Sequence, residues 1–236
     1  MVGAAAYDVG VTIERDIVPR GRHAPPLAVR LDVQRRRLFA AAAAVFARSG
    51  YADASAEGIS REAGMSKATF YEHFANKEEC LLAMFDTGVE EVMGEMAAAS
   101  EGLEVDRYEE RVRAVNRAFL GALAVHPDST YTLIVTILGA GPRAAARRGE
   151  VLEAFAESLY QANARNAPAF GAPTFASRDD AYAVVGATVE LVARHLRGED
   201  GNDDLLDLEP VISPMTSSTP VSNIASRHSS LLAKCS

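Results

Sequence analysis

Hydroxyl, basic and aromatic side chains are concentrated between Ser55 and Phe74, where they offer hydrogen bonds to phosphate and to the edges of bases. The stretch is predicted to form a short helix, a turn at Gly64 and a second short helix that carries most of these side chains. This is the layout by which a helix-turn-helix presents a recognition helix to the major groove of DNA. The pattern therefore predicts a DNA-binding segment.

The first helix of this pair is predicted from its cap and its apolar spacing. Ser55 can accept a bond from a backbone N–H group of the first turn. Ile59 and Ala63 are four residues apart, so they share one face and should point into a core. Gly64 suits the position after a helix, because a positive φ costs glycine little.

The second helix is predicted to begin at Ser66, which can cap it in the same way. Phe70 and Phe74 are again four residues apart and should face inward. Asn76 is predicted to start a further helix, with Glu79 as the partner in a capping box. The side chains left more exposed on the second helix are Lys67, Thr69, Tyr71 and His73.

Residues 34–85 resemble the DNA-binding domain of TetR-type transcriptional regulators. The resemblance implies an all-helical homodimer, in most cases a repressor that releases DNA when a small molecule binds its second domain. Beyond this stretch the likeness is only architectural. The positions that carry it are Leu38, Ala42, Phe46, Gly50, Tyr51, Ile59, residues 63–71, His73, Phe74, Lys77 and Glu78.

The resemblance also implies roles for matching positions. Lys67 and Thr69 are candidates for base-edge or phosphate contact, and Tyr71, His73 and Lys77 for phosphate contact. One departure is Glu72, where a basic or neutral residue is frequent; it either weakens attraction to DNA or points away. The complete candidate set for DNA contact is Arg36, Ser55, Ser66, Lys67, Ala68, Thr69, Tyr71, His73 and Lys77.

The charge is divided unequally along the chain, whose net charge is −8. Residues 1–77 carry 11 Lys and Arg against 8 Asp and Glu, whereas residues 78–236 carry 13 against 24. The acidic part would repel DNA and is excluded as the contact surface. Residues 1–30, with their arginines and prolines, are either a solvated leader or a flexible basic arm that reaches the DNA backbone or minor groove.

The fold class is predicted to be all-α, because alanine-rich and helix-periodic segments dominate and no β-branched run is flanked by turn signals. The predicted domains are an N-terminal arm (1–30), a helix-turn-helix domain (31–78), a helical ligand-binding and dimerisation domain (79–199) and a mostly disordered tail (200–236). Helices are expected at about 33–49, 77–99, 105–125, after 128, at 142–165 and at 177–198.

The C-terminal tail is predicted to break the last helix. Leu205, Leu206 and Leu208 begin a helix, but Pro210 and the prolines that follow should end it by about Glu209, since proline inside a helix costs about 3 kcal/mol. Residues 213–236 are expected to be disordered. The dimer interface would then depend on the helices at 180–197 and 143–165.

The second domain is expected to hold a largely hydrophobic ligand, because most small-molecule sites are lined by apolar side chains. The homodimer would place two recognition helices about 34–36 Å apart or somewhat more, on a near-palindromic operator. The candidate ligand-binding residues are Phe119, Leu123, Tyr131, Ile137, Phe155 and Leu159.

Other classes of function are disfavoured. The sequence has no glycine-rich phosphate loop, no nucleophile elbow and no paired Cys/His set, so neither an enzyme, a metal site nor a cofactor is expected. Segments are too short and interrupted to span a membrane, and no signal-peptide core is evident, which predicts a cytoplasmic protein. The alternatives are a helical dimeric scaffold, or a small-molecule-binding protein without operator binding.

Overall fold

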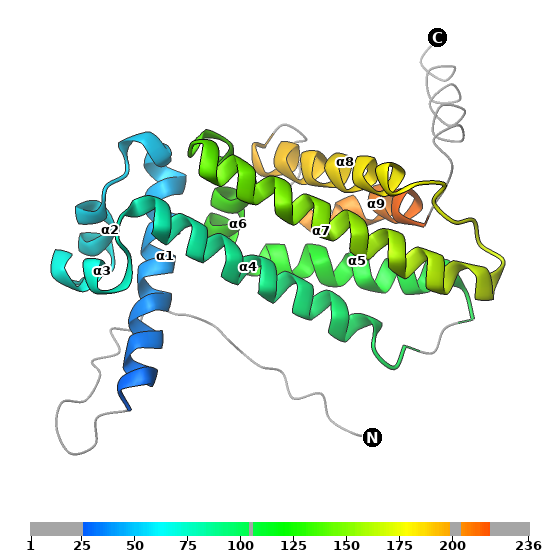
Figure 1. Ribbon diagram of the computed structural model, residues 1–236, viewed down its shortest axis with the longest axis horizontal. Coiled ribbons are helices and arrows are strands. Elements are labelled where there is room, and N and C mark those ends of the chain that lie inside the picture. Colours follow the sequence, from blue (N-terminus) through cyan, green and yellow to red (C-terminus); the bar gives the residue numbers. More distant parts are fainter. Residues whose placement is uncertain (1–25, 104–105, 199–203, 218–236) are drawn as a thin grey trace, which may run out of the picture. The chain divides into compact units, whose positions relative to one another are not determined.

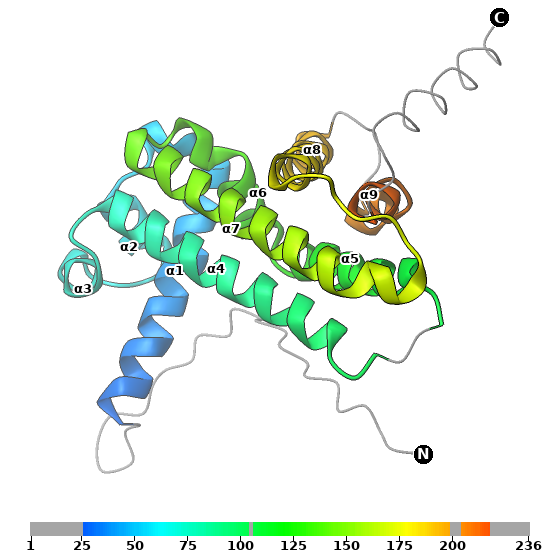
Figure 2. The same ribbon diagram turned by 45° about the vertical axis from the view of Figure 1, so that its right-hand side comes forward.

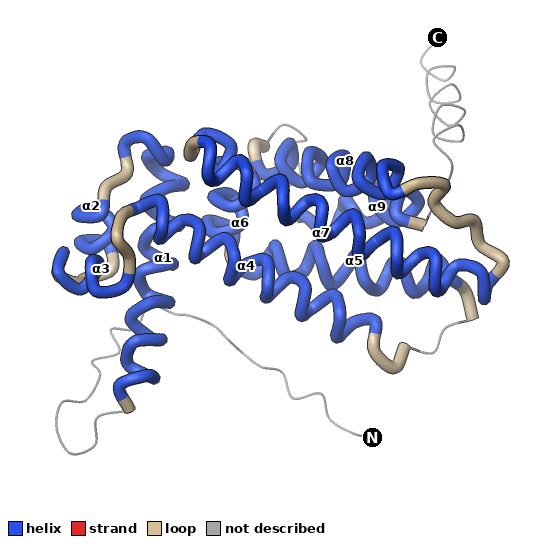
Figure 3. Tube along the Cα trace, in the orientation of Figure 1, coloured by secondary structure: helices blue, strands red, loops and turns tan. Residues whose placement is uncertain are grey.

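The computed structural model describes residues 26–103, 106–198 and 204–217 (Figure 1 and Figure 2). The regular secondary structure of these residues is entirely helical (Figure 3), which confirms the all-α prediction. The elements are α1 (Leu27–Asp53), α2 (Ala56–Glu62), α3 (Lys67–His73), α4 (Lys77–Ser100), α5 (Tyr108–Val125), α6 (Pro127–Ile134), η1 (Thr136–Gly139), α7 (Pro142–Asn166), η2 (Ala167–Phe170), α8 (Arg178–Leu196), η3 (Leu205–Leu208) and α9 (Glu209–Thr216).

The chain divides into two units, Met1–Arg37 and Leu38–Ser236. In the first unit the structure describes residues 26–37, and the rest of the predicted basic arm lies outside the described residues. No helix of the described ranges is both long and apolar enough to cross a membrane.

Helix α1 begins at Leu27, earlier than the predicted start at Val33. The reason is that Pro26 opens the helix, although prolines in this region were expected to break it. The carbonyl oxygen of Pro26 accepts the N–H of Arg30 at 3.1 Å. Proline lacks only the N–H that a first helical turn leaves unpaired, so it is well tolerated at this place.

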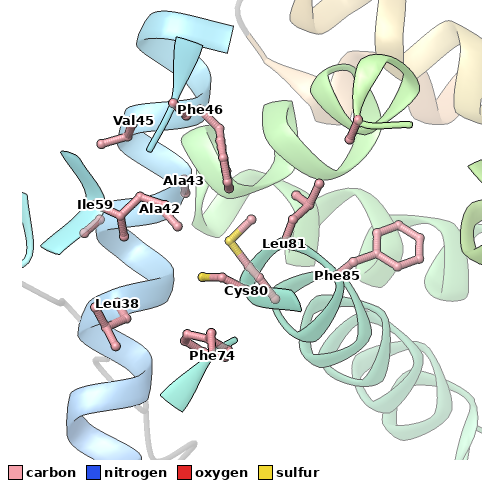
Figure 4. Packing of buried hydrophobic residues seen from close by; sticks show 14 of the residues in the cluster. Leu38, Ala42, Ala43, Val45, Phe46, Ile59, Phe74, Cys80, Leu81 and Phe85 are labelled. Carbon is pink, nitrogen blue, oxygen red and sulfur yellow. The ribbon is translucent and has the colours of Figure 1, made fainter. Parts of the chain in front are cut away.

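A first buried cluster joins the helix-turn-helix segment to α4, η1 and α7. In Figure 4 residues along α1 face Cys80 and Leu81 at the start of α4. The cluster includes residues on both sides of the predicted domain boundary at residues 78/79. The boundary itself stays a prediction. The largest fully buried members of the cluster are Leu38, Phe46, Ile59, Phe70, Leu81 and Ile137.

A second buried cluster joins α5 and α8 to the C-terminal elements η3 and α9. Its buried members are Leu120, Leu123, Val192, Leu205, Leu208 and Ile212. Beside it, the Asn116 side-chain amide donates to Ser213 Oγ at 3.0 Å and to Thr216 Oγ1 at 2.8 Å. Ser213 Oγ in turn donates to the buried Glu209 carboxylate at 2.6 Å.

This packing corrects the prediction for the tail. The chain is helical from Glu209 to Thr216 with Pro214 inside the helix, whereas a stop at Glu209 and disorder from residue 213 were expected. Burying each large aliphatic side chain contributes about 1.5–3 kcal/mol, and the hydrogen bonds of Asn116 add to this, so together they outweigh the proline. The part of the predicted tail beyond residue 217 lies outside the described residues.

Asn116→Ala tests whether this polar joint holds α9. The free energy of unfolding should fall by about 1–3 kcal/mol, because two side-chain hydrogen bonds are lost in a buried place. Hydrogen exchange should also accelerate in α9. The matched control is Asn166→Ala, since the Asn166 amide bonds to Ala162 within its own helix. Equal exchange in α9 for both variants would contradict the assignment.

Candidate nucleic-acid interface

The turn between α2 and α3 is built by local hydrogen bonds. Ser55 caps α2, where its Oγ accepts the N–H of Gly58 at 3.0 Å. Gly64 has a φ of +64°, and its N–H bonds to the carbonyl oxygen of Arg61 at 3.1 Å. The positive φ is the conformation predicted for this glycine, and it reverses the chain within a few residues.

Ser66 caps α3 as the sequence predicts. Its Oγ accepts the N–H of Thr69 at 3.0 Å and lies 2.9 Å from Thr69 Oγ1. The two hydroxyls therefore hold one another at the first turn of α3. Each still has hydrogen-bonding capacity for an external group, because a hydroxyl has one donor and two acceptor sites.

The inward face of α3 is aromatic. Phe70 is fully buried and Phe74, directly after the helix, is buried too, which confirms the prediction for both. Their ring centroids lie 5.7 Å apart, and the ring of Phe74 stacks on Phe39 of α1 at 5.6 Å. Such ring pairs add about 0.5–1.5 kcal/mol to burial, so α3 is attached firmly to α1.

The outward face of α3 carries the hydrogen-bonding side chains. Lys67, Ala68 and Tyr71 are exposed, and Thr69 and His73 are half-buried. Tyr71 keeps 50% of its surface exposed, and Lys67 Nζ lies 6.0 Å from the centre of its ring. A lysine and a phenol are thus presented together on one exposed stripe.

Glu72 is exposed as well. It is the immediate neighbour of Tyr71, and adjacent helical residues do not share a face. Its carboxylate therefore does not lie on the stripe of Lys67 and Tyr71.

Lys77 has a role that the sequence analysis missed. Its ammonium donates to the carbonyl oxygens of Tyr51 at 2.7 Å, Ala52 at 3.0 Å and Ala54 at 2.9 Å. It also lies 4.5 Å from the centre of the Tyr51 ring. An ammonium has three N–H donors, and all three are used here. Lys77 thus holds residues 51–54, which follow a break in the helical backbone of α1 at Gly50, where φ is +73°. Its contact with phosphate stays a prediction.

The start of α4 departs from the predicted capping box. Asn76 Oδ1 accepts the N–H of Glu79 at 2.9 Å, which is the first half of the box. The Glu79 carboxylate instead accepts a hydrogen bond from Arg143 of α7 at 2.8 Å. A guanidinium offers a charge-assisted bond, which is stronger than a bond to a backbone N–H.

Arg36 lies in the first unit on an exposed turn of α1. Its Nε donates to Asp32, one helical turn earlier, at 3.0 Å. Both side chains are largely exposed, so this pair contributes little stability and leaves the guanidinium accessible. Contact between Arg36 and phosphate stays a prediction.

The six candidate ligand-binding residues are not gathered into one site. Ile137 and Phe155 belong to the first cluster, and Phe119 and Leu123 to the second. Leu159 is half-buried on α7. Tyr131 lines a surface hollow of about 270 Å³ together with Ala47, Pro127, Asp128 and Leu196.

A larger hollow of about 410 Å³ lies between α4 and α7, and the sequence analysis did not identify it. Its lining residues come from two helices far apart in the chain, so no local pattern pointed to it. They are Glu79, Leu82, Ala83, Asp86, Arg143, Ala146, Arg147 and Glu150.

Lys77→Met tests the structural role of this lysine. Methionine keeps most of the aliphatic stem but removes the three hydrogen bonds to the end of α1. The free energy of unfolding should therefore fall by about 1–3 kcal/mol in urea denaturation. Lys67→Met is the matched control, because Lys67 is exposed on α3. If both variants unfold at the same urea concentration, Lys77 does not stabilise the junction.

Comparison with known proteins agrees with this geometry. Residues 38–84 match the model of the family described as bacterial regulatory proteins, tetR family. A stretch of 103 residues is 33% identical to the HTH-type transcriptional activator FasR of Mycolicibacterium smegmatis. That match covers 44% of this chain and 46% of FasR, so it spans about half the length of the relative.

Solved structures share the fold over most of the chain. The fatty acid degradation regulator FadR from Bacillus halodurans has a TM-score of 0.69 at 18% identity, covering 79% of this chain and 95% of its own. FadR from Bacillus subtilis, solved in complex with stearoyl-CoA, has a TM-score of 0.67 at 17% identity, covering 78% and 98%. Residues 38–84 therefore carry a helix-turn-helix domain of the tetR type, and the chain shares the fold of these solved regulators.

Proposed function

We propose that the protein is a ligand-responsive regulator that binds a near-palindromic operator as a homodimer, with α3 of each protomer in a major groove. The observation that carries this proposal is the two-sided character of α3. Phe70 and Phe74 attach one side to the core, while Lys67 and Tyr71 stand exposed on the other. Rigid placement of donors on an exposed helix is what groove recognition requires.

The division of charge supports contact through this end of the chain. Residues 1–77 carry an excess of basic side chains, and residues 78–236 a large excess of acidic ones. Phosphate attracts the first and repels the second, so the duplex is oriented towards α3. In the proposed complex Tyr71, His73, Ser55 and Arg36 contact phosphate, and Lys67 and Thr69 reach phosphate or base edges.

A homodimer is supported by apolar side chains that the chain leaves exposed near its C-terminal elements. Tyr182 of α8, Leu206 of η3 and Val211 of α9 are exposed, and these three elements pack against one another. Exposed apolar surface of this kind favours a partner. The partner is a second copy, whose own α3 then meets the next major groove about 34–36 Å away or somewhat further.

The effector in this proposal is a long-chain acyl thioester. One structure of the same fold holds stearoyl-CoA, and apolar side chains of α5 and α7 suit an acyl chain. Three side-chain polar atoms within the described residues are buried without a hydrogen-bond partner, and two of them, Thr188 Oγ1 and His195 Nε2, belong to α8. Both lie on the α8 face that carries Val192, and they offer hydrogen bonds to a polar group of a ligand.

The signal reaches the DNA-binding helices through α4 and α6. A Cβ atom at Gly88 of α4 would lie 2.7 Å from Leu133 Cδ1, so α6 approaches α4 very closely. Thr132 Oγ1 of α6 also donates to the carbonyl oxygen of Ala43 in α1 at 3.4 Å. A ligand shifts this arrangement only by binding one conformation more tightly than another. Repression relieved by the ligand is the proposed direction, as in most TetR-type regulators.

Selection of bound sequences from a random DNA pool tests the operator. The purified protein should enrich a near-palindromic consensus at two salt concentrations. Its affinity should fall steeply with salt, in proportion to the phosphates neutralised. Stearoyl-CoA should then release the selected DNA, whereas free CoA should not. A dimer that enriches nothing at either salt concentration would favour the scaffold or ligand-binding alternative.

Variants of α3 separate phosphate contact from base contact. Tyr71→Phe should weaken binding to all sequences alike, by about ten- to a hundredfold, because a hydrogen bond to a charged group contributes about 1.5–3 kcal/mol. Thr69→Ala should instead change the preferred sequence, and Thr69→Ser, which keeps the hydroxyl, should change it less. Unaltered binding by Tyr71→Phe, or an unaltered consensus for Thr69→Ala, would show that the respective residue is assigned wrongly.

A further inference from the structure

Helices α4 and α7 run side by side (Figure 1 and Figure 2). The hollow of about 410 Å³ is lined by residues near the start of each helix. The apolar residues that line this hollow are small or half-buried: Leu82, Ala83 and Ala146. The buried residues around the start of α7 are Ala140, directly after η1, and Ala144, in the first turn of α7. Alanines bury little area, so hydrophobic packing alone holds this end of α7 to α4 weakly.

Ion pairs span the hollow instead. Arg143 Nη1 of α7 donates to Glu78 at 2.9 Å and to Glu79 at 2.8 Å, both in the first turn of α4. One turn further along α7, Arg147 donates to Asp86 of α4 at 2.7 Å and to Glu150 at 2.8 Å. We name the contacts of Arg143 and Arg147 with α4 the α4–α7 clamp.

Each guanidinium of the clamp meets two carboxylates: Arg143 meets Glu78 and Glu79, and Arg147 meets Asp86 and Glu150. Isolated exposed ion pairs contribute little, but networks with good geometry fix orientation. Hydrogen bonds to Glu79 and Glu78 raise the pKa of Arg143 further above its ordinary value. Arg143 therefore stays charged wherever the protein is folded, and the clamp persists as long as the carboxylates are ionised.

The clamp meets α4 close to the recognition helix. Residues 77–79 follow α3 after a short turn. Within these three residues, Lys77 is tied to the end of α1, and Glu78 and Glu79 are tied to α7. The segment that leaves α3 is thus held from two sides by charged side chains.

We propose that Arg143 is a positioning residue for DNA binding, which fixes the start of α4, and through it α3, on the first turn of α7. The predicted effect on operator affinity rests on the proposed operator binding. The predicted effect on the placement of α4 does not. A ligand that moves α7 then moves the recognition helix through the clamp. Because α3 must match a groove at a set spacing, looser placement lowers operator affinity more than non-specific affinity.

Arg143→Gln in the full-length protein is the test. Hydrogen exchange of residues 75–80 should accelerate several-fold in the free protein. The ratio of operator to non-specific affinity should fall about fivefold, since free placement of α3 must be ordered on binding. For Arg143→Lys, both the exchange rate and the affinity ratio should lie between those of Arg143→Gln and the wild type, because lysine keeps the charge but not the forked geometry.

Arg178→Gln is the matched control. Arg178 also meets two carboxylates, Glu153 at 2.8 Å and Glu157 at 3.1 Å, and it is 50% exposed where Arg143 is 56% exposed. It ties α8 to α7 through Glu153 and Glu157, neither of which lies in residues 77–79. Both glutamine variants should melt within about 2 °C of each other, since both remove surface pairs.

A coupling measurement checks that Arg143 acts through the two glutamates. If it does, Glu78→Gln/Glu79→Gln combined with Arg143→Gln should lower the affinity ratio no further than Arg143→Gln alone. Exchange and affinity ratio equal to those of Arg178→Gln would overturn the proposal. Should no operator exist, the proposed function fails by itself, and the exchange of residues 75–80 still decides whether the clamp positions α4.

Discussion

The burial of one side of α3 is the constraint on which the candidate interface depends. The helix spans 7 residues, and helices this short are unstable alone because nucleation is unfavourable. Phe70 and Phe74 secure it by packing against α1 within a cluster that also includes α4. Each exposed side chain of α3 takes its position from these two rings, so the candidate interface is positioned by aromatic packing rather than by charge.

Charged side chains then fix the orientation of the helices, which apolar packing alone leaves adjustable. Apolar packing is non-directional, and it tolerates small rotations of one helix on another. The hydrogen bonds of Lys77 to the end of α1, and those of Glu78 and Glu79 to Arg143, are directional. Three consecutive residues of α4 therefore connect the recognition helix to two other helices. Lys77 and Glu78, which belong to the family resemblance, here hold α4 to neighbouring helices.

The candidate ligand residues lie among helices whose buried side chains form two separate clusters. Ile137 packs with the DNA-binding helices, whereas Leu123 packs with α8 and the C-terminal segment. Under the proposed function, a ligand that contacts both clusters would influence the DNA-binding helices and the proposed dimer surface together. Asn116 and Glu209 add a polar joint to the second cluster, and this joint keeps α9 in place despite its internal proline.

Local features of the sequence determined the helix-turn-helix, since caps, a glycine turn and four-residue apolar spacing act within a few residues. Ser55, Ser66, Gly64 and Phe70 have the roles that these rules predict. Contacts between distant residues were decided only by the tertiary structure: Lys77 bonds to Tyr51, and Arg143 bonds to Glu78. Long-range contacts also keep Pro214 within a helix, and they separate the candidate ligand residues, of which Ile137 and Leu123 lie in different clusters. A local sequence pattern cannot predict which distant residues will be in contact, because the free energy of such contacts arises only when the helices pack together.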